Sequence, residues 1–163
     1  LMGFRSLPWV VDQANDWLAE NARRDWSVLE FGSGSSTIWF SANCGGVLAV
    51  EHNPLWAVQV RPNLGANASV VVKSRPYAWY PRTGQFDFVL VDGRDRVRCV
   101  AKSLSRVKPG GVLMLDNSER SWYRPAFEAL AGWEMLGEAE QCGLDYCGFA
   151  YPGWRTTWWR KPN

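Results

Sequence analysis

The feature that most constrains the fold of this chain is an apolar run that ends in a carboxylate and enters a glycine-rich turn. The run covers residues 27–31, and the turn that follows reads Gly32-Ser33-Gly34-Ser35. Such a turn between a strand and a helix lets the backbone approach a ligand closely. Glu51 comes nineteen residues after Gly32, at the end of the next apolar run. An acidic side chain at the tip of a second strand can bind both hydroxyls of a ribose. The two features therefore predict a site for a nucleoside-containing cofactor.

The residues around the turn indicate which kind of cofactor fits. A dinucleotide site has the pattern G-x-G-x-x-G, in which the third glycine lets the helix pack closely. Thr37 stands at that third position here. Glu30 precedes the glycines, where its carboxylate would repel a pyrophosphate but would attract an ammonium group directly or through water. The E-x-G-x-G form thus favours a cofactor that carries an ammonium group and no phosphate.

The rest of the chain alternates apolar strands with helical segments. The expected strands cover residues 27–31, 46–51, 69–73, 86–91, 112–115, 133–138 and 155–160. The expected helices cover about 7–18, 36–42, 54–65, 95–107 and 123–130. Alternation of this kind, with strands that are continuously apolar, predicts a parallel sheet with helices on both faces.

The last two strands have no convincing helix between them, so we expect them to pair antiparallel. The chain has 163 residues, which suits one domain and is too short for two. The prediction is therefore a single domain over residues 1–163. Its fold class is α/β, with a doubly wound, mostly parallel seven-stranded sheet and an antiparallel edge pair. The leading helix is expected to cover one edge of this sheet. Ligands should bind beyond the carboxyl ends of the strands, beside the first strand.

Three segments resemble motifs of the class I S-adenosylmethionine-dependent methyltransferases. The turn at residues 30–34 is similar to their motif I, residues 90–93 (Leu-Val-Asp-Gly) are similar to motif IV, and residues 108–113 are similar to the loop and strand that follow it. The resemblance covers residues 26–117, with a closing pair of strands beyond. It implies the Rossmann-like fold of that family and S-adenosylmethionine as the cofactor.

The resemblance also implies roles for individual residues. Glu51 would bind the ribose hydroxyls and Glu30 the amino-acid end, while the adenine would lie against His52 with Lys73 or Ser74 at its edge. The expected cofactor-binding residues are Glu30, Gly32, Gly34, Ser35, Glu51, His52, Ser74 and Asp92.

Three oxygen-bearing side chains follow the fourth and fifth expected strands. Asp92, Asp116 and Asn117 resemble the metal-binding set of the catechol-type O-methyltransferases, and such ligands suit Mg²⁺. A metal there would lower the pKa of a bound hydroxyl. Asp92 is the expected catalytic residue. The alternative is a metal-free site in which Asp116 caps the following turn.

The leading functional interpretation is a methyltransferase that acts on oxygen of a small or sugar-like acceptor. Residues 74–85 and 140–153 are the candidate acceptor lid. An alternative is an assembly protein that keeps the fold and the cofactor pocket but has no acceptor chemistry. A third interpretation is an NAD(P)-dependent oxidoreductase, which Thr37 and Glu30 disfavour and for which the chain has no Tyr-x-x-x-Lys motif.

Composition limits the partners. The formal net charge is only +2, so nucleic acid is not expected, and no apolar run has the roughly 20 residues that a membrane span needs. The first residues contain no signal-peptide core, which predicts a cytoplasmic location. The sequence is compatible with a homo-oligomer. One region is basic, and we interpret it as a solvated helix face of which some residues could meet an anionic acceptor. Its members are Arg94, Arg96, Arg98, Lys102, Arg106 and Lys108.

Overall fold

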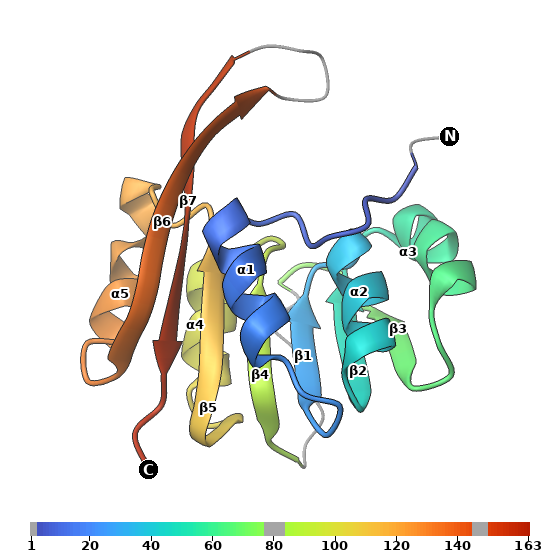
Figure 1. The fold of residues 1–163 in the computed structure, drawn as a ribbon, viewed down its shortest axis with the longest axis horizontal. Coiled ribbons are helices and arrows are strands. Elements are labelled where there is room, and N and C mark those ends of the chain that lie inside the picture. The colour runs from blue at the N-terminus through green and yellow to red at the C-terminus, as the bar shows by residue number, and fades with distance from the viewer. Residues whose placement is uncertain (1–2, 77–83, 145–149) are drawn as a thin grey trace.

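The structure, a computed structural model, describes residues 3–76, 84–144 and 150–163. Within these residues the strands form one seven-stranded sheet in the order β3-β2-β1-β4-β5-β7-β6 (Figure 1). The strands are β1 Ser27–Phe31, β2 Gly46–Glu51, β3 Ala68–Val72, β4 Phe86–Val91, β5 Val107–Asp116, β6 Glu134–Leu144 and β7 Ala150–Arg160. The first five are parallel, and β7 runs antiparallel to both β5 and β6. The predicted fold class, including the antiparallel edge pair, is confirmed.

Helices cover both faces of the sheet. They are α1 Asp12–Asn21, α2 Ser35–Asn43, α3 Pro54–Val60, α4 Arg96–Ser103 and α5 Arg124–Ala129, with short 3-10 turns η1 Arg61–Asn63 and η2 Ser121–Tyr123. Helices α1, α2 and α3 pack on one face, and α4 and α5 pack on the other (Figure 1). Apolar strands between two helical layers explain why the central strands are buried along almost their whole length. No helix of the described residues is long and apolar enough to cross a membrane.

The leading helix differs from the prediction in its start and its position. It begins at Asp12 rather than near residue 7, because the preceding segment is extended, with ψ of 153° at Val11. It also lies over the middle of the sheet and not over an edge, since Ala14 and Leu18 are buried in a cluster with residues of the central strands. The strand residues of that cluster include Val28, Phe88, Leu90 and Met114.

Strand β5 is longer than predicted. The segment Lys108–Gly111 was expected to separate a helix from a strand, but it lies within β5. The pairing with β4 shifts there, because Phe86 is opposite Val107 whereas Phe88 is opposite Val112. The extra residues form a bulge, which accommodates a proline and two glycines without ending the strand. Helix α4 accordingly ends at Ser103, before the predicted residue 107.

The carboxyl ends of β1, β2, β4 and β5 meet at one edge of the sheet. Strand β1 pairs with β2 on one side and with β4 on the other, so the chain changes direction across the sheet at this point. The turns that follow the two neighbours β1 and β4 therefore diverge and leave a crevice between them, which is where doubly wound folds bind ligands.

Candidate functional site

A cleft of about 1780 Å³ opens at this edge of the sheet. A cavity of this size exceeds the 300–1,000 Å³ that is typical of a small-molecule pocket, so two small ligands can share it. Of the predicted site residues, the cleft is lined by Gly32, Glu51, His52, Asp92, Asp116 and Asn117. Four others do not line it, namely Glu30, Gly34, Ser35 and Ser74. The structure thus brings together residues from the ends of four strands.

The glycine turn lies between the ends of β2 and β4. Its first residue, Gly32, has φ of 108°, a left-handed conformation that side chains rarely adopt. A Cβ at this position would lie 3.3 Å from the backbone nitrogen of Gly93. The Gly32 N–H donates to the Val50 carbonyl (2.9 Å), and the Asp92 N–H donates to the Phe31 carbonyl (3.0 Å). The turn is therefore held by backbone bonds, and glycine is required for its conformation.

Glu30 lies beneath the turn and is buried, with 1% of its surface exposed. Its carboxylate accepts hydrogen bonds from the hydroxyls of Ser36 and Thr37, the second at 2.6 Å. The Thr37 hydroxyl in turn accepts from the Gly34 N–H at 2.9 Å. Glu30 thus fixes the start of α2. Thr37, which stands where a dinucleotide site has a glycine, contributes its hydroxyl to this network. Contact between Glu30 and the amino-acid end of a cofactor stays a prediction.

Burial changes the acidity of Glu30. Desolvation raises the pKa of its carboxyl to about 7, although the hydrogen bonds from Ser36 and Thr37 act in the opposite direction. The negative charge of Glu51 adds to the increase in pKa. Near neutral pH, Glu30 is therefore only partly ionised.

Glu51 presents a fixed carboxylate at the cleft. Its Oε1 atom accepts hydrogen bonds from the N–H groups of His52 and Asn53, each at 2.8 Å. Its Oε2 atom accepts from the Ser33 hydroxyl at 3.0 Å. The Trp56 indole donates to the Ser33 carbonyl at 2.7 Å and so holds the second turn residue in place. These contacts leave acceptor capacity on Oε2, because a carboxylate oxygen has two lone pairs.

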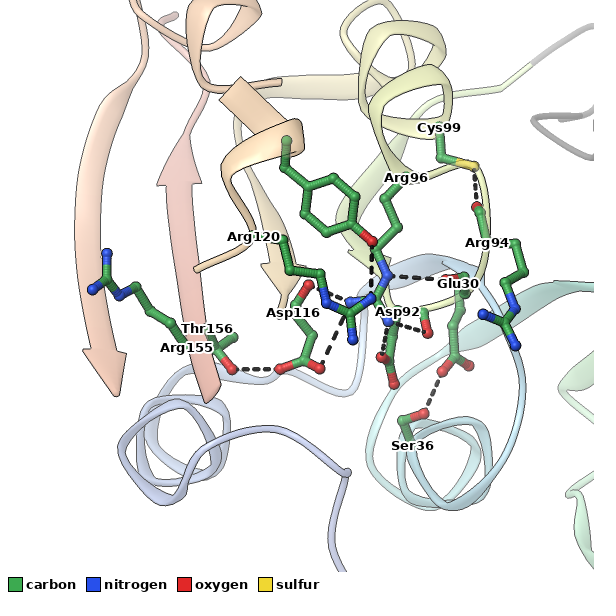
Figure 2. Close-up of polar contacts among 12 residues, drawn as sticks. Glu30, Ser36, Asp92, Arg94, Arg96, Cys99, Asp116, Arg120, Arg155 and Thr156 are labelled. Atoms are coloured by element: carbon green, nitrogen blue, oxygen red, sulfur yellow. Dashed lines mark hydrogen bonds and ion pairs between the residues drawn. The ribbon is translucent and has the colours of Figure 1, made fainter. Parts of the chain in front are cut away.

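A buried arginine joins the ends of β4 and β5 (Figure 2). The Arg96 guanidinium donates to both the carbonyl and the carboxylate of Asp92, at 3.1 and 3.2 Å. It also donates to the carbonyl of Asp116 and lies 3.7 Å from the Asp116 carboxylate. A further bond reaches the Gly93 carbonyl (2.9 Å), and Thr156 on β7 donates to the Asp116 carboxylate at 2.7 Å. The two aspartates therefore share one cation.

The two aspartates are less acidic than exposed ones. Burial raises the pKa of Asp92 to about 6, against the opposing charge of Arg96. Burial also raises the pKa of Asp116 well above its ordinary value, and the neighbouring Asp92 charge adds to this shift. Two carboxylates at close range do not both ionise readily, so each opposes the ionisation of the other.

The structure does not support the predicted Mg²⁺ site at Asp92, Asp116 and Asn117. The Arg96 guanidinium interacts with both carboxylates and supplies the positive charge that a metal would provide. Asn117 lines the cleft in a left-handed conformation (φ 50°). The described residues contain no group of three or more histidine, cysteine or acidic side chains that could hold a metal. Sequence analysis did not reveal this role of Arg96, because an arginine four residues after an aspartate is typical of an exposed helix.

Several residues that line the cleft were not among those predicted from the sequence. Arg120 and Trp122 follow the end of β5 by a few residues, so the rule that ligands bind beyond strand ends could have found them. Arg5 and Trp9 precede α1, and no local pattern places them here. The Arg5 N–H donates to the Ser35 hydroxyl at 2.9 Å, which ties the N-terminal segment to the glycine turn.

The β6–β7 hairpin forms another wall of the cleft through Gln141, Gly143 and Trp154. Gln141 exchanges two hydrogen bonds with Asp12 at the start of α1: the Asp12 N–H donates at 2.7 Å, and the Gln141 amide donates back at 3.0 Å. The hairpin is thus fastened to the helix that precedes β1. The predicted lid segments fall partly outside the described residues, namely at 77–83 and 145–149. Of their described parts, Arg75, Gln141 and Gly143 line the cleft.

The sequence matches no protein-family model and no curated protein. The structure, by contrast, superposes on solved methyltransferases over most of its length. Precorrin-6y C5,15-methyltransferase from Geobacter metallireducens matches with a TM-score of 0.72 and 18% identity, over 97% of this chain and 94% of that chain. The N-methyltransferase NodS from Bradyrhizobium japonicum, solved with S-adenosyl-L-homocysteine, matches with a TM-score of 0.67 and 12% identity, over 90% and 82%. The chain has the class I methyltransferase fold.

A third similar structure is named as a decarboxylase and not as a methyltransferase. Precorrin 8w decarboxylase from Methanobacterium thermoautotrophicum matches with a TM-score of 0.72 and 16% identity, over 98% of this chain and 96% of that chain. The near-complete coverage on both sides shows that this methyltransferase-fold domain has about the size of some of its structural neighbours. At these identities the likeness establishes the fold, while the chemistry has to be argued from the cleft.

Proposed function

We propose that this methyltransferase-fold chain is an S-adenosylmethionine-dependent enzyme that methylates an oxygen of a small acceptor. The observation that carries the proposal is the Glu51 carboxylate, held at the cleft beside the Gly32 turn by two backbone N–H donors. A fixed acidic acceptor next to a turn without side chains suits the ribose of a nucleoside.

The residues present fit this cofactor. Glu51 would accept hydrogen bonds from the ribose hydroxyls, and the absence of a side chain at Gly32 leaves the backbone open to a closely bound ligand. Glu30 beneath the turn and Asp92 at its side place carboxyl groups close to the glycine turn, which favours the ammonium and sulfonium groups of S-adenosylmethionine over a pyrophosphate at that position. Bound here, S-adenosylmethionine would supply a methyl group on a positively charged sulfur.

Asp92 is the residue that we assign to proton transfer. Its side chain is 24% exposed and lines the cleft, so an acceptor hydroxyl can reach it. Its pKa of about 6 lets the carboxylate take up the proton that the acceptor oxygen loses at neutral pH. Arg96 orients the carboxylate by one hydrogen bond to it and holds the Asp92 backbone by a second bond to its carbonyl. The chain would thus position the acceptor and remove its proton, which are the two requirements of O-methylation.

The proposal is tested by incubating the purified chain with methyl-labelled S-adenosylmethionine and a panel of hydroxyl-bearing small molecules. We expect label to transfer to at least one acceptor. The Asp92→Asn variant should bind the cofactor but transfer little label. Binding of the cofactor with no transfer to any acceptor would instead favour an assembly protein that retains the pocket.

A further inference from the structure

The cleft is lined by more arginines than the proposed proton transfer requires. Among the described residues that line it there is no lysine, and its arginines are Arg5, Arg75, Arg94, Arg96, Arg98 and Arg120. Arg96 is engaged by Asp92 and Asp116, and Arg75 pairs with Asp95 at 2.6 Å. Arg120 lies 3.7 Å from the Glu119 carboxylate, and the Arg5 guanidinium lies over the Trp9 ring. Arg94 and Arg98 are exposed residues of the cleft lining.

Arg120 is the arginine placed best to meet an acceptor. It lies beside Arg96 in Figure 2, and its positive charge lowers the pKa of Asp92, so the two groups are close in space. Its guanidinium is 6.0 Å from the Trp122 ring and donates to the Tyr123 hydroxyl at 3.3 Å. Trp122 is 67% exposed and lines the same cleft. A guanidinium beside an exposed ring can bind a flat molecule that carries an oxyanion.

The basic stretch identified in the sequence divides between the cleft and other surfaces. Arg94 and Arg98 are exposed and line the cleft from the start of α4. Lys108 lies elsewhere, because its ammonium group pairs with Asp87 at 2.8 Å. Arg106 donates to the Gly84 carbonyl. The arginines nearest the carboxyl end of β4 are thus those that line the cleft. The basic stretch is therefore not one uniformly solvated helix face.

The proposed cofactor makes this charge more significant. Its sulfonium and ammonium groups are positive, so a wall of arginines would oppose its binding unless negative charge is also present. The described lining of the cleft holds four acidic residues, Glu51, Asp92, Asp95 and Asp116, against its six arginines. A negatively charged acceptor would provide the missing charge.

We infer that the methyl acceptor is an anion, and that Arg120 and Arg98 bind its carboxylate or phosphate group while Trp122 contacts its body. This inference rests on the proposed methyltransferase function. Arginine suits the role because its planar fork matches a carboxylate or phosphate with two parallel hydrogen bonds. The acceptor hydroxyl then lies toward Asp92, and the anionic group lies on the arginine side of the cleft.

The test uses three probes of one shape: benzoate, phenyl phosphate and the neutral benzamide. Each is titrated into the full chain at constant ionic strength, with tryptophan fluorescence as the readout, in the presence of S-adenosylhomocysteine. We expect at least one anion to bind about tenfold or more tightly than benzamide, because a charge-assisted pair is lost with the amide. Preference for benzoate or for phenyl phosphate identifies the acceptor group.

Two variants and a matched control assign the effect. Arg120→Gln and Arg98→Gln should each reduce the preference for the anion, whereas Arg124→Gln should not. Arg124 is an exposed arginine that pairs with Glu128 and is not among the cleft residues. Thermal unfolding confirms that each variant is folded, and Arg98→Gln remains informative if Arg120→Gln is not.

Three outcomes would overturn the inference: equal binding of benzamide, no binding of either anion, or an anion preference that survives both cleft substitutions. Titration of S-adenosylhomocysteine alone separates this result from the proposed function. If that compound binds and the anions do not, the methyltransferase proposal stands and the anionic acceptor is rejected. If it does not bind, the methyltransferase proposal is rejected and the inference falls with it.

Discussion

Glu51 is the residue on which the proposed cofactor site depends most. The residue is 4% exposed but lines the cleft, so a bound ribose would interact with a nearly desolvated charge. Replacing it by alanine should weaken S-adenosylhomocysteine binding by about 1–3 kcal/mol, because a charge-assisted hydrogen bond is lost. Calorimetric titration measures the change. Glu128→Ala, at an exposed glutamate of α5, is the control, and an unchanged affinity of the Glu51 variant would refute the ribose assignment.

Asp92 gives the site a predicted pH dependence. Since its pKa is raised to about 6, the carboxylate form that accepts a proton increases as pH rises through this value. Turnover should therefore increase from about pH 5 to about pH 7 and then level off. Asp92→Asn should lower turnover by about 10²–10⁴-fold and remove this increase. If the asparagine variant keeps the same pH profile, another group is the base.

Glu30 makes a distinct prediction about stability. Its folded-state pKa of about 7 lies above the value of 4.5 expected in the unfolded chain, so the folded state binds the proton more tightly. Protonation of Glu30 therefore contributes to the free energy of unfolding in full below about pH 4.5, and this contribution is lost as pH rises through 7. Glu30→Gln should gain stability relative to the wild type across this range, by at most about 3 kcal/mol. A difference in unfolding temperature that does not vary with pH would contradict this account.

At the scale of elements, the β6–β7 hairpin is closely packed at glycines. A Cβ at Gly137 would lie 2.2 Å from the ring of Trp158, which is buried in the core between the sheet and α1. Gly137→Ala should therefore destabilise the fold by about 1–3 kcal/mol, because the indole has to move. Gly132→Ala is the matched control, since its Cβ would meet no atom within 4 Å. Chemical denaturation of both variants measures the effect, and equal stability would show that the indole repacks freely.

Other elements show where sequence patterns predict the bounds of an element correctly and where they mislead. Strands β1, β2 and β4 have the predicted bounds, because each is a continuous apolar run that ends at a glycine or an acidic residue. The leading helix starts later than predicted, because Val10 and Val11 continue the apolar spacing of a helix although they precede it. Spacing reports which residues are buried, and it does not distinguish a helix from an extended segment that packs on the same sheet.

At the scale of the whole molecule, the cleft combines parts that are far apart in the sequence. The glycine turn and the strand-end acids were predicted, because parallel strands place their carboxyl ends at one edge. The N-terminal segment and the hairpin complete the cleft through Arg5, Trp9 and Trp154, and only the tertiary structure brings them there. The pairing of Arg96 with two aspartates on different strands was likewise beyond local pattern analysis.

The central claim is that this cleft binds an S-adenosyl cofactor. The most direct measurement is a calorimetric titration of the purified chain with S-adenosylhomocysteine, followed by the same titration with NADH. We predict saturable one-to-one binding of S-adenosylhomocysteine in the micromolar range and no binding of NADH, because Glu30 and Thr37 disfavour a pyrophosphate. Binding of NADH in place of S-adenosylhomocysteine, or of neither compound, would contradict the account.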